Sequence, residues 1–599
     1  MTRRISSVAI ENLRKYTLEA PPQNRHYMVA KLGANSPSAS KGYEQMAIYV
    51  SQNSPEHNEE ILTGPVYLKQ NVKIEPLLFG WLAWSHLLSP VQSAMNVSFR
   101  YLPLLQSFVT NPNVHVAATR DPTLFGGPFV HLLPEDVPGV RSLIEQTRKS
   151  LGPLLQLAID IKTFDAQLQE GSKGFSFNEV YSKIPQSLSG MVELMYDINN
   201  HPRIHFIEEL LYAEYGEMLV SNLQVSLSMV RESERRFFMS TPRMKSSENF
   251  TIEVPITNSA LDELTSMKIQ PVPLDALENS LGVANLATRY RDFFTSSAPH
   301  RDAPDYSGDH VRVRYFGHAC VLVQTAAISV LIDPVFAYEP NDSALKSCAR
   351  FTVCDLPDKI DYVVLSHCHQ DHFSAEMLLG IRPRISKVVI PTNNRGSIVD
   401  PSMKLILSQL GFLDVIALGN FDSISFEEGK IMSIPFPGEH SDLDVYSKQS
   451  IFLEIKGRKF LFLVDSDGRD VALYQRVSQR ISGSSQGKVD ALFLGMECHG
   501  APLTWLYGPL LSKSITRRDD ESRRLSGSNY ERAVGIVREF TCKQVYVYAM
   551  GQEPWLKYVM GLEYGADSIQ LKESEKLVSH CRGEGMISER LYGSKDIMF

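Results

Sequence analysis

The stretch DYVVLSHCHQDH, residues 361–372, carries three histidines and one aspartate within its last six positions. The preceding YVVL is a short β-branched run typical of a buried strand, so the polar residues lie on the loop at its end. Loops at strand ends are where α/β proteins place their chemistry. Imidazole nitrogens and carboxylates bind metals, and so many in one loop favour a metal site over a solvated loop.

The spacing H-x-H-x-D-H divides into two pairs of donors, which favours two metal ions over one. His367 with His369 would bind one ion, and Asp371 with His372 would bind the other. A carboxylate from elsewhere in the chain would have to bridge them. The apolar run FLFLV ends on Asp465, which is the type of position where a bridging aspartate would lie. The alternative for Asp465 is a turn residue or a helix cap.

A third candidate lies in SIPFPGEHSDLDV, residues 433–445. Here Glu439 and His440 follow a loop that contains proline and glycine. The side chains of neighbouring residues point apart in an extended segment. We therefore expect one of the two side chains to bind metal and the other to lie behind the ligands.

Composition and charge argue against several classes of protein. The 599 residues are 43% hydrophobic and 21% charged, and the net charge of −8 argues against a nucleic-acid binder, which usually has a basic face. The apolar stretch at 76–88 is too short to span a membrane, and we expect a buried helix there. Residues 1–20 show no secretory signal. The seven cysteines have no disulfide-like spacing and fit reduced thiols in the cytoplasm.

The pattern of apolar residues changes once along the chain. Helical periodicity dominates the N-terminal part, and we expect a mainly helical (α+β) domain over residues 1–295. A polar stretch at 296–310, with prolines and turn formers, predicts a linker. From 311 to 599, alternating and apolar strand-like runs are separated by helical segments, which predicts an α/β domain.

Several motifs of the C-terminal part resemble a known superfamily. H-x-H-x-D-H after a strand, LIDP at 331–334 upstream and Asp465 downstream resemble the metallo-β-lactamase fold, an αββα sandwich with a two-metal site at one edge. Most members have a histidine in the third motif, whereas PFPGEH at 435–440 places Glu439 there. That departure resembles the diiron β-hydroxylase family of nonribosomal peptide and antibiotic biosynthesis.

Further stretches in both parts of the chain carry the same resemblance. They include DPTLFGGPFVHLLPED at 121–136, GMECHGAPLTWLYGPLL at 495–511 and VYVYAMGQEPWLKYVMGLEYGADS at 545–568. The similar region extends from about residue 75 to the C-terminus, and the order of the two domains is similar as well. This weighs more than H-x-H-x-D-H alone, a motif that mostly marks hydrolases.

The resemblance implies a non-haem diiron monooxygenase that uses O₂. The substrate of such enzymes is an aminoacyl group held as a thioester on the carrier domain of a nonribosomal peptide synthetase, and the product is β-hydroxylated. The N-terminal domain would serve in a homodimer and in contact with the synthetase. We find no dinucleotide-binding fingerprint and no iron–sulfur cysteine pattern, so the electron donor is expected to be a separate protein.

Carried over by position, the resemblance also implies a set of metal ligands. The matching residues are His367, His369, Asp371, His372, Glu439 and Asp465. Glu439 and Asp465 are expected to be catalytic as well. Hydrolases of this fold add a histidine at the end of a late strand, but QVYVYAMGQE at 544–553 contains none. The best-placed replacement is His499, for which the alternative is a loop histidine bonded to a neighbour.

The chemistry of these residues favours iron over zinc. Zinc sites favour histidine and cysteine, whereas added carboxylates suit harder ions, and Cys368 is expected to point away from the metals. One alternative is a dinuclear metallohydrolase acting on a phosphodiester, lactone or thioester through a metal-bound hydroxide, which His440 as the ligand would favour. A second is a non-enzymatic scaffold that only recruits a synthetase.

Two motifs of the N-terminal part invite a phosphate-binding interpretation. Arg243 in STPRM could contact a phosphate, but we expect an interdomain salt bridge instead. GGPF at 126–129 lacks the strand–helix context of a phosphate loop, and we expect a turn.

Overall fold

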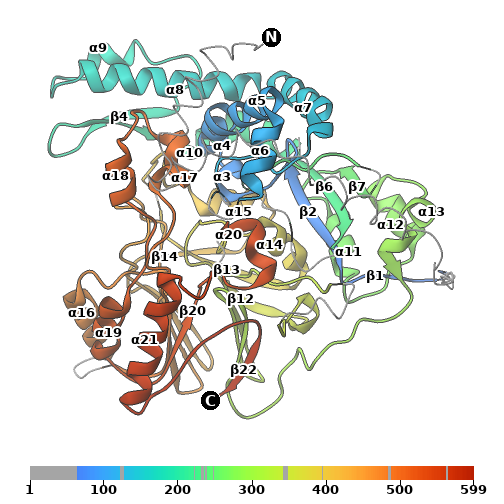
Figure 1. Ribbon diagram of the computed structural model, residues 1–599, viewed down its shortest axis with the longest axis vertical. Coiled ribbons are helices and arrows are strands. Elements are labelled where there is room, and N and C mark those ends of the chain that lie inside the picture. Colours follow the sequence, from blue (N-terminus) through green and yellow to red (C-terminus); the bar gives the residue numbers. More distant parts are fainter. Residues whose placement is uncertain are drawn as a thin grey trace, which may run out of the picture. The chain divides into compact units, whose positions relative to one another are not determined.

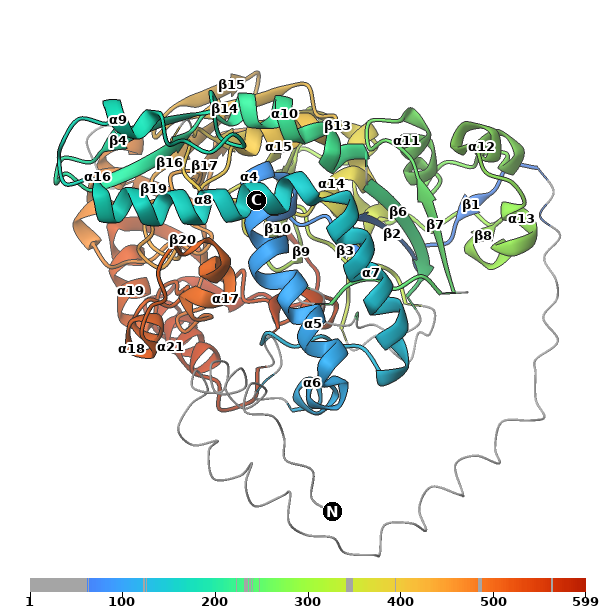
Figure 2. The same cartoon turned by 90° about the horizontal axis from the view of Figure 1, so that it is seen from above.

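The structure is a computed structural model, shown in two views in Figures 1 and 2. It describes residues 62–599, apart from 63, 122–123, 125–126, 222, 231–234, 236–238, 240, 247, 341–347, 394, 483–486 and 562–563. The segment 1–20, expected to carry no secretory signal, and Gly126 of the GGPF motif therefore lie outside the described residues. Residues 62–514 and 520–599 form one compact unit.

The N-terminal region, residues 62–295, combines helices with small antiparallel sheets. Its helices are α3 (Ser85–Leu88), α4 (Pro90–Asn96), α5 (Leu102–Thr110), α6 (Pro112–Thr119), α7 (Val137–Ser150), α8 (Gly152–Gly171), α9 (Asn178–Tyr181), α10 (Glu208–Ser221), α11 (Ser259–Ser266), α12 (Leu274–Leu281) and α13 (Leu286–Arg289). Its strands are β1 (Tyr67–Leu68), β2 (Val72–Leu78), β3 (Trp81–Leu82), β4 (Val192–Tyr196), β5 (Pro202–Phe206), β6 (Leu223–Met229), β7 (Asn249–Glu253) and β8 (Phe294–Thr295). In Figure 2, α7 and α8 lie beside α4 and α5.

The apolar stretch 76–88 is buried as predicted, but its expected helix is wrong. It forms the end of β2, a tight turn, β3 and only the four-residue helix α3. Phe79 and Gly80 both have positive φ, 51° and 86°, so they form the two central residues of a hairpin turn. An apolar stretch of this length is thus compatible with a buried hairpin as well as with a buried helix.

The C-terminal region, residues 311–599, is an αββα sandwich, as the sequence predicted. The first seven-stranded sheet holds β14 (Val415–Leu418), β13 (Ile385–Pro391), β12 (Ile360–Val364), β11 (Ser329–Ile332), β10 (Cys320–Gln324), β9 (Arg312–Gly317) and β22 (Lys595–Met598), in that order. The second holds β15 (Ser423–Phe426), β16 (Gly429–Ile434), β17 (Ser450–Ile455), β18 (Arg458–Phe462), β19 (Gly487–Gly495), β20 (Phe540–Tyr548) and β21 (Ile587–Arg590).

Helices follow several strands of the sandwich. They are α14 (Ala375–Ile381), α15 (Met403–Gln409), α16 (Val471–Ser482), α17 (Leu503–Tyr507), α18 (Arg517–Ser522), α19 (Tyr530–Glu539), α20 (Lys557–Met560) and α21 (Ile569–Gly583). Figure 1 shows α16, α19 and α21 grouped together, and their apolar side chains pack on the second sheet. Between the sheets, fully buried side chains such as Val321, Val364, Phe462 and Phe493 form the core.

The strand order determines where the site lies. Strands β11 to β14 are parallel to one another, and so are β18 to β21. The carboxyl ends of parallel strands meet at one edge of a sheet, where loops converge. The loops after β11, β12, β18 and β19 therefore open at the edge that carries the polar motifs.

A buried charge network joins the N-terminal region to α14. Glu75, on β2, is 1% exposed and accepts a hydrogen bond from Arg243 Nε at 2.9 Å. Arg235 donates to Glu75 and to both carboxylate oxygens of Glu376 on α14, at 3.0 and 2.9 Å. Arg243 does form a salt bridge, but its partner lies in its own region. Arg235 makes the ion pair between the regions, which corrects the expectation for Arg243.

A half-buried carboxylate lies where α10 meets the start of α15. Glu208 accepts a hydrogen bond from the backbone nitrogen of Ser402, the N-cap of α15, at 2.9 Å. Burial raises the pKa of Glu208 to about 7, and the nearby charge of Asp400 contributes to the rise. Between the ordinary pKa of glutamate and pH 7, the folded chain thus binds more protons than the unfolded chain.

Unfolding free energy must therefore fall as pH rises through that window. Compared with Glu208→Gln, which carries no charge to bury, we expect the wild type to lose up to about 3 kcal/mol between pH 5 and 8. Chemical denaturation of both proteins at several pH values measures the difference. Glu217→Gln, which removes an exposed charge further along α10, is the matched control. Parallel pH curves for wild type and Glu208→Gln would contradict the prediction.

Candidate metal centre

The loop after β12 folds its histidines inward. β12 lies between two parallel neighbours, which explains its apolar sequence, and α14 begins directly after the loop. Ser374 caps α14 by accepting a hydrogen bond from the backbone nitrogen of Met377. His367 and His372 are fully buried, and His369 is 6% exposed. The loop is thus closed at both ends, with its imidazoles in the interior.

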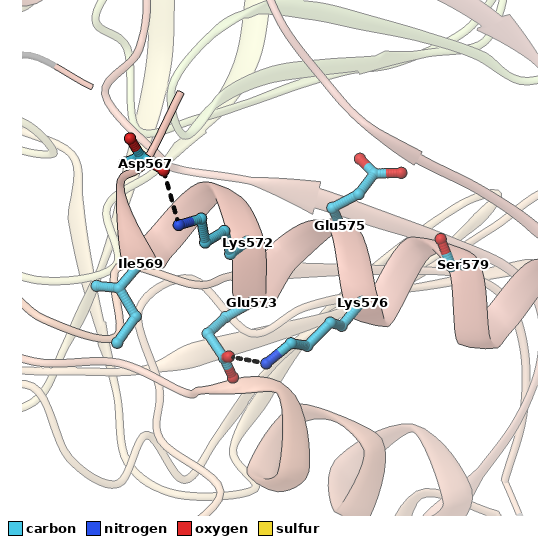
Figure 3. Close-up of a pocket in the computed structure, with 7 residues that line it drawn as sticks. All are labelled: Asp567, Ile569, Lys572, Glu573, Glu575, Lys576 and Ser579. Carbon is cyan, nitrogen blue, oxygen red and sulfur yellow. Dashed lines mark hydrogen bonds and ion pairs between the residues drawn. The ribbon is translucent and has the colours of Figure 1, made fainter. Parts of the chain in front are cut away.

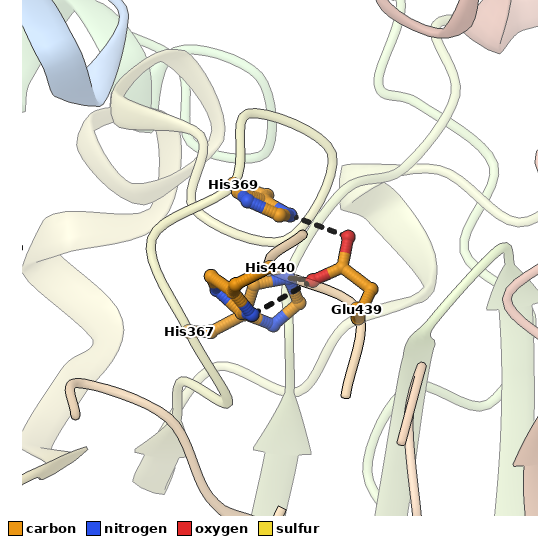
Figure 4. Close-up of side chains that lie close together, drawn as sticks. All are labelled: His367, His369, Glu439 and His440. Atoms are coloured by element: carbon orange, nitrogen blue, oxygen red, sulfur yellow. Dashed lines mark ion pairs between the residues drawn. The ribbon is translucent and has the colours of Figure 1, made fainter. Parts of the chain in front are cut away.

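One group of donors contains His367, His369, Glu439 and His440, whose nearest donor atoms all lie within 4.8 Å of one another. His369 Nδ1 lies 2.8 Å from Glu439 Oε1, and His367 Nε2 lies 3.7 Å from Glu439 Oε2. Figure 4 shows the Glu439 carboxylate facing both histidines. This is the geometry of three donors around one ion.

His440 also faces this group. Its Nδ1 lies 3.1 Å from Glu439 Oε2, and its ring stacks on His369. We expected neighbours in an extended segment to diverge, but the segment is not extended here. Gly438 and Glu439 have φ values of 91° and 66°, in the left-handed region. This backbone turn brings both side chains of the pair to the same place.

Two further groups share His372. One contains His318, Asp371 and His372, with His318 Nε2 at 3.2 Å from Asp371 Oδ2. The other contains His367, His372 and Asp465, with His372 Nε2 at 2.8 Å from Asp465 Oδ2. Asp465 therefore lies between the two pairs of the histidine loop, where a bridging carboxylate was expected.

We expected no metal-site role for His318, which lies in the stretch YFGHACVLV at 315–323. It occupies the tight turn between β9 and β10, after Gly317, with a φ of 50°. The backbone of Asp333, Glu439 and Val464 also has positive φ, in or near the left-handed region. Val464, a β-branched residue at φ 53°, is the most unusual of these, and it directly precedes Asp465. Backbone strain of this kind gathers at functional sites.

Asp333 of the LIDP motif orients two histidines. Its Oδ2 accepts a hydrogen bond from His372 Nδ1 at 2.9 Å and from Ser366 Oγ at 2.6 Å. Ser366 Oγ in turn lies 2.9 Å from His367 Nδ1. Both Nδ1 atoms are thus engaged behind the rings, which leaves both Nε2 atoms to face the donor cluster. Carboxylates behind ligating histidines hold their orientation in this way.

Asp333→Asn is expected to weaken iron binding by about 10- to 100-fold, the usual cost of losing a partner behind a ligating histidine. An amide can still accept a hydrogen bond but carries no charge to balance the imidazole. Titration of the apoprotein with ferrous iron under anaerobic conditions measures the change. Asp358→Asn, at an exposed position before β12, is the control. An unchanged iron affinity in Asp333→Asn would show that the carboxylate has no such role.

The structure does not bring His499 to the cluster. Its side chain is exposed, and it belongs to none of the donor groups found among the described residues. A tight turn in which Cys498 N donates to Met496 O reverses the chain just before it, so the imidazole points to solvent. The expectation for His499 as the last ligand is therefore corrected.

Glu497, in the same loop, belongs to none of the donor groups either, but it lies near enough for the charges of Asp371 and Asp465 to act on its carboxyl. Burial raises the pKa of its carboxyl well above the usual value, and the negative charges of Asp371 and Asp465 raise it further. The position of Glu497 after a strand could have indicated a ligand from the sequence alone. Glu497 follows the end of the apolar strand β19 by two residues, as Asp465 follows β18 by three. A preference for histidine, taken from hydrolases, directed attention to His499.

The N-terminal region holds the histidine loop from outside. Ser85 Oγ donates to the carbonyl of Cys368 at 2.7 Å, and Gln370 Nε2 lies 2.6 Å from His86 Nδ1. His86 Nε2 lies 2.8 Å from the hydroxyl of Tyr101. Burial lowers the pKa of His86 to about 3, so the imidazole is neutral and its Nδ1 accepts from the Gln370 amide. Helix α3 thus fixes the backbone between the ligands.

The donors fit a pair of metal ions. Buried polar atoms are almost always hydrogen-bonded, yet His367 Nε2, Glu439 Oε2 and Asp465 Oδ1 are buried here without a hydrogen bond, although charged groups lie near them. All three point into the donor groups, where a cation would satisfy them. The donor groups contain more carboxylates than zinc sites usually do, and they do not include Cys368. Oxygen-rich donor sets of this kind suit iron.

Comparison with known proteins agrees with this site. Residues 67–299 match the family model of the diiron non-haem β-hydroxylase N-terminal domain, and residues 312–457 match a β-lactamase superfamily domain. The 4-amino-L-phenylalanyl-[CmlP-peptidyl-carrier-protein] 3-hydroxylase of Streptomyces venezuelae is 34% identical over 531 residues, which are 88% of this chain and 98% of that one. The chain belongs to the diiron non-haem β-hydroxylases.

Solved structures place the whole hydroxylase in the same fold. The crystal structure of CmlA, a diiron β-hydroxylase from Streptomyces venezuelae, has a TM-score of 0.82 and 33% identity, covering 90% of this chain and all of that one. A variant of CmlA has a TM-score of 0.80 and 32% identity, covering 89% and 100%. The predicted fold, the β-hydroxylase activity and the pair of irons are thereby confirmed. No helix in the described part of the hydroxylase is long and apolar enough to cross a membrane.

Proposed function

We propose that this hydroxylase inserts one oxygen atom at the β-carbon of an aminoacyl group held as a thioester on a carrier domain of a nonribosomal peptide synthetase. The observation that carries the proposal is the Glu439 carboxylate at the histidine cluster of a chain similar over nearly its full length to a carrier-protein-dependent hydroxylase. One O₂, two electrons and two protons would yield the hydroxylated product and one water.

We assign the donors as follows. His367, His369 and Glu439 would hold one iron, because these three already converge. Asp371 and His372 would hold the second, with Glu497 as the further ligand in place of His499. Asp465 would bridge the two ions. His318 and His440 lie close enough to serve in the same cluster, and His440 would otherwise orient Glu439.

Bound iron would supply the activation of O₂ and the oxidising power needed to remove hydrogen from Cβ. The protein's own residues provide the geometry for that step. Tyr507, which is 4% exposed, places its hydroxyl 3.0 Å from His369 Nε2 and so leaves Nδ1 for the metal side. Phe436 packs edge-on against His367 and keeps water from the ring. The excess of carboxylates stabilises the oxidised state of the metal pair.

The partners belong to the same proposal. A separate electron-donor protein would reduce the irons, because the sequence has no flavin or iron–sulfur fingerprint of its own. A homodimer and a cytoplasmic location are also proposed. All seven cysteines are free, which agrees with a reducing compartment.

The first test is the metal content of the purified protein, with an optical spectrum before and after reduction. We expect about two irons per chain and an oxygen-dependent spectrum that bleaches on reduction. Carrier-bound aminoacyl substrates and the same free amino acids would then be compared for the gain of one oxygen by mass spectrometry. Two zincs without an oxygen-dependent spectrum, from cells supplied with iron, would favour the metallohydrolase instead.

A further inference from the structure

A cavity of about 260 Å³ lies between the N-terminal and C-terminal regions, outside the metal cluster. α8 and β5 form one wall, and the loop after β13 forms another. Three cations line it: Lys162 on α8, Arg203 on β5 and Arg395 on the loop. Apolar side chains make up part of the remaining wall: Met95, Ile161, Ile204, Phe206, Ile398 and Leu510. The cavity therefore combines positive charge with an apolar surface.

The three cations form no ion pair with any carboxylate in the part of the chain that the structure describes. Two acidic residues also line the cavity, but both have other partners. Asp165 Oδ1 accepts from the Gln169 amide at 3.2 Å, and Asp444 accepts from the Tyr446 hydroxyl. Three cations and two carboxylates leave the cavity with an excess of one positive charge, carried by side-chain donors that suit an anion.

Another hollow of the surface shows the contrast. It runs along α21 and is also lined by lysines, as Figure 3 shows. There, Lys572 pairs with Asp567 at 3.0 Å and Lys576 pairs with Glu573 at 2.5 Å. Its cations are already neutralised. The cations of the cavity at α8 and β5 have contacts with rings and a sulfur, but no carboxylate pairs with them among the described residues, so their charge can still attract an anion.

Two of these cations converge on one side chain. The Arg395 guanidinium lies 4.0 Å from the centre of the Tyr446 ring, and Arg203 is close enough for its charge to act on the same hydroxyl. Arg203 comes from the N-terminal region and Arg395 from the C-terminal region. An anion between them would be held by forked donors from both regions, an arrangement that suits phosphate.

Two chain segments beside the cavity continue to residues that contact the metal cluster. Tyr446 precedes Lys448 by two residues, and Lys448 forms a backbone bridge with His367. Leu510 follows Tyr507 by three residues, and the Tyr507 hydroxyl bonds His369. Two residues of chain and one bridge separate Tyr446 from His367, a Cα separation of at most about 12 Å.

We propose that this cavity binds the phosphodiester of a phosphopantetheine arm and so sets the distance at which the thioester-bound aminoacyl group meets the metal cluster. This rests on the proposed function. The arm from phosphate to sulfur has as many backbone atoms as four to five amino-acid residues, and it spans about 15 Å when extended. Its gem-dimethyl group would lie against the apolar wall. The charge, the lining and the distance to the cluster all suit this ligand.

The test measures binding of two probes, 4′-phosphopantetheine and pantetheine, to the full chain by calorimetry. We expect the phosphorylated probe to bind at least about tenfold more tightly, the factor that 1.4 kcal/mol represents. The double variant Arg203→Gln/Arg395→Gln should lose this preference and leave the affinity for pantetheine unchanged. Lys572→Gln/Lys576→Gln, which removes the two paired cations of the α21 hollow, should keep the preference.

Equal binding of both probes to the wild type would overturn the proposal, and so would equal losses for both in the double variant. Binding of the carrier domain is also measured with and without its phosphopantetheine arm. This comparison distinguishes the phosphate of the arm from the acidic surface of the carrier as the source of negative charge. If the double variant weakens binding of both carrier forms equally, the cations contact the acidic surface of the carrier, and the phosphate site is rejected. Because binding needs no turnover, a phosphate preference in a protein that hydroxylates no carrier-bound substrate would reject only the proposed reaction. Hydroxylation without a phosphate preference would reject only the site.

Discussion

Replacing Asp465 with asparagine is expected to lower β-hydroxylation and iron affinity by at least about 100-fold, because even a lost partner behind a ligand costs 10- to 100-fold. The carboxylate lies 2.8 Å from His372 Nε2, and its other oxygen is buried without a partner. Asparagine keeps the shape but carries no charge, and its amide cannot bridge two cations. Iron content, and hydroxylation of a carrier-bound aminoacyl group, would be measured together.

Asp470→Asn provides the matched control for Asp465→Asn. It makes the same chemical change five residues further along the chain, at an exposed position. The control should retain both irons and full activity. If Asp465→Asn also retained two irons and normal turnover, Asp465 would be one of the turn residues that the sequence left as an alternative.

Replacing Arg235 with methionine is expected to destabilise the fold by about 3–5 kcal/mol, the usual cost of removing one partner from a buried ion pair. Arg235 is 8% exposed and bonds Glu376 through two nitrogens. The Tyr558 ring lies 3.9 Å from its guanidinium. Without the guanidinium, the Glu376 carboxylate would stay buried beside the hydroxyl of Tyr338 alone. Denaturant unfolding of the iron-loaded protein measures the loss.

Arg458→Met is the control for this second prediction. Arg458 also pairs with a carboxylate, Asp490, but its side chain is 43% exposed. Exposed pairs contribute about 0–1 kcal/mol, so we expect a small change. Equal effects of the two substitutions would show that the Arg235 network does not hold the regions together.

The sequence predicted those parts of the site that local patterns specify. The histidine loop follows a β-branched strand, and Asp465 ends an apolar run, so both could be placed at strand ends and hence at one edge. The sandwich follows from the same alternation of strands and helices. Glu439 could be identified because it departs from a histidine that the superfamily usually has. In each case, the signal lies within a few residues of the ligand.

What the sequence did not predict depends on backbone turns or on distant partners. The turn at Cys498 leaves His499 exposed, while Glu497 feels the charges of the cluster, and no local pattern encodes that difference. The left-handed backbone at Glu439 brings His440 to the same side, against the rule for extended segments. Arg235 could not be assigned because its partners are 160 and 141 residues away. Such pairings become visible only in the folded chain.

The hold of α3 on the histidine loop has a consequence for the order of assembly. Ser85 and His86 leave the ribosome long before Cys368 and Gln370, the residues they contact. Helix α3 cannot make these contacts until the histidine loop has been synthesised, and we expect the loop to reach its final conformation only when the two are in contact. We therefore expect iron to be loaded only after the two regions have met. The isolated sandwich, although it carries every donor of the cluster, would present them on an unsupported loop and compete poorly for metal.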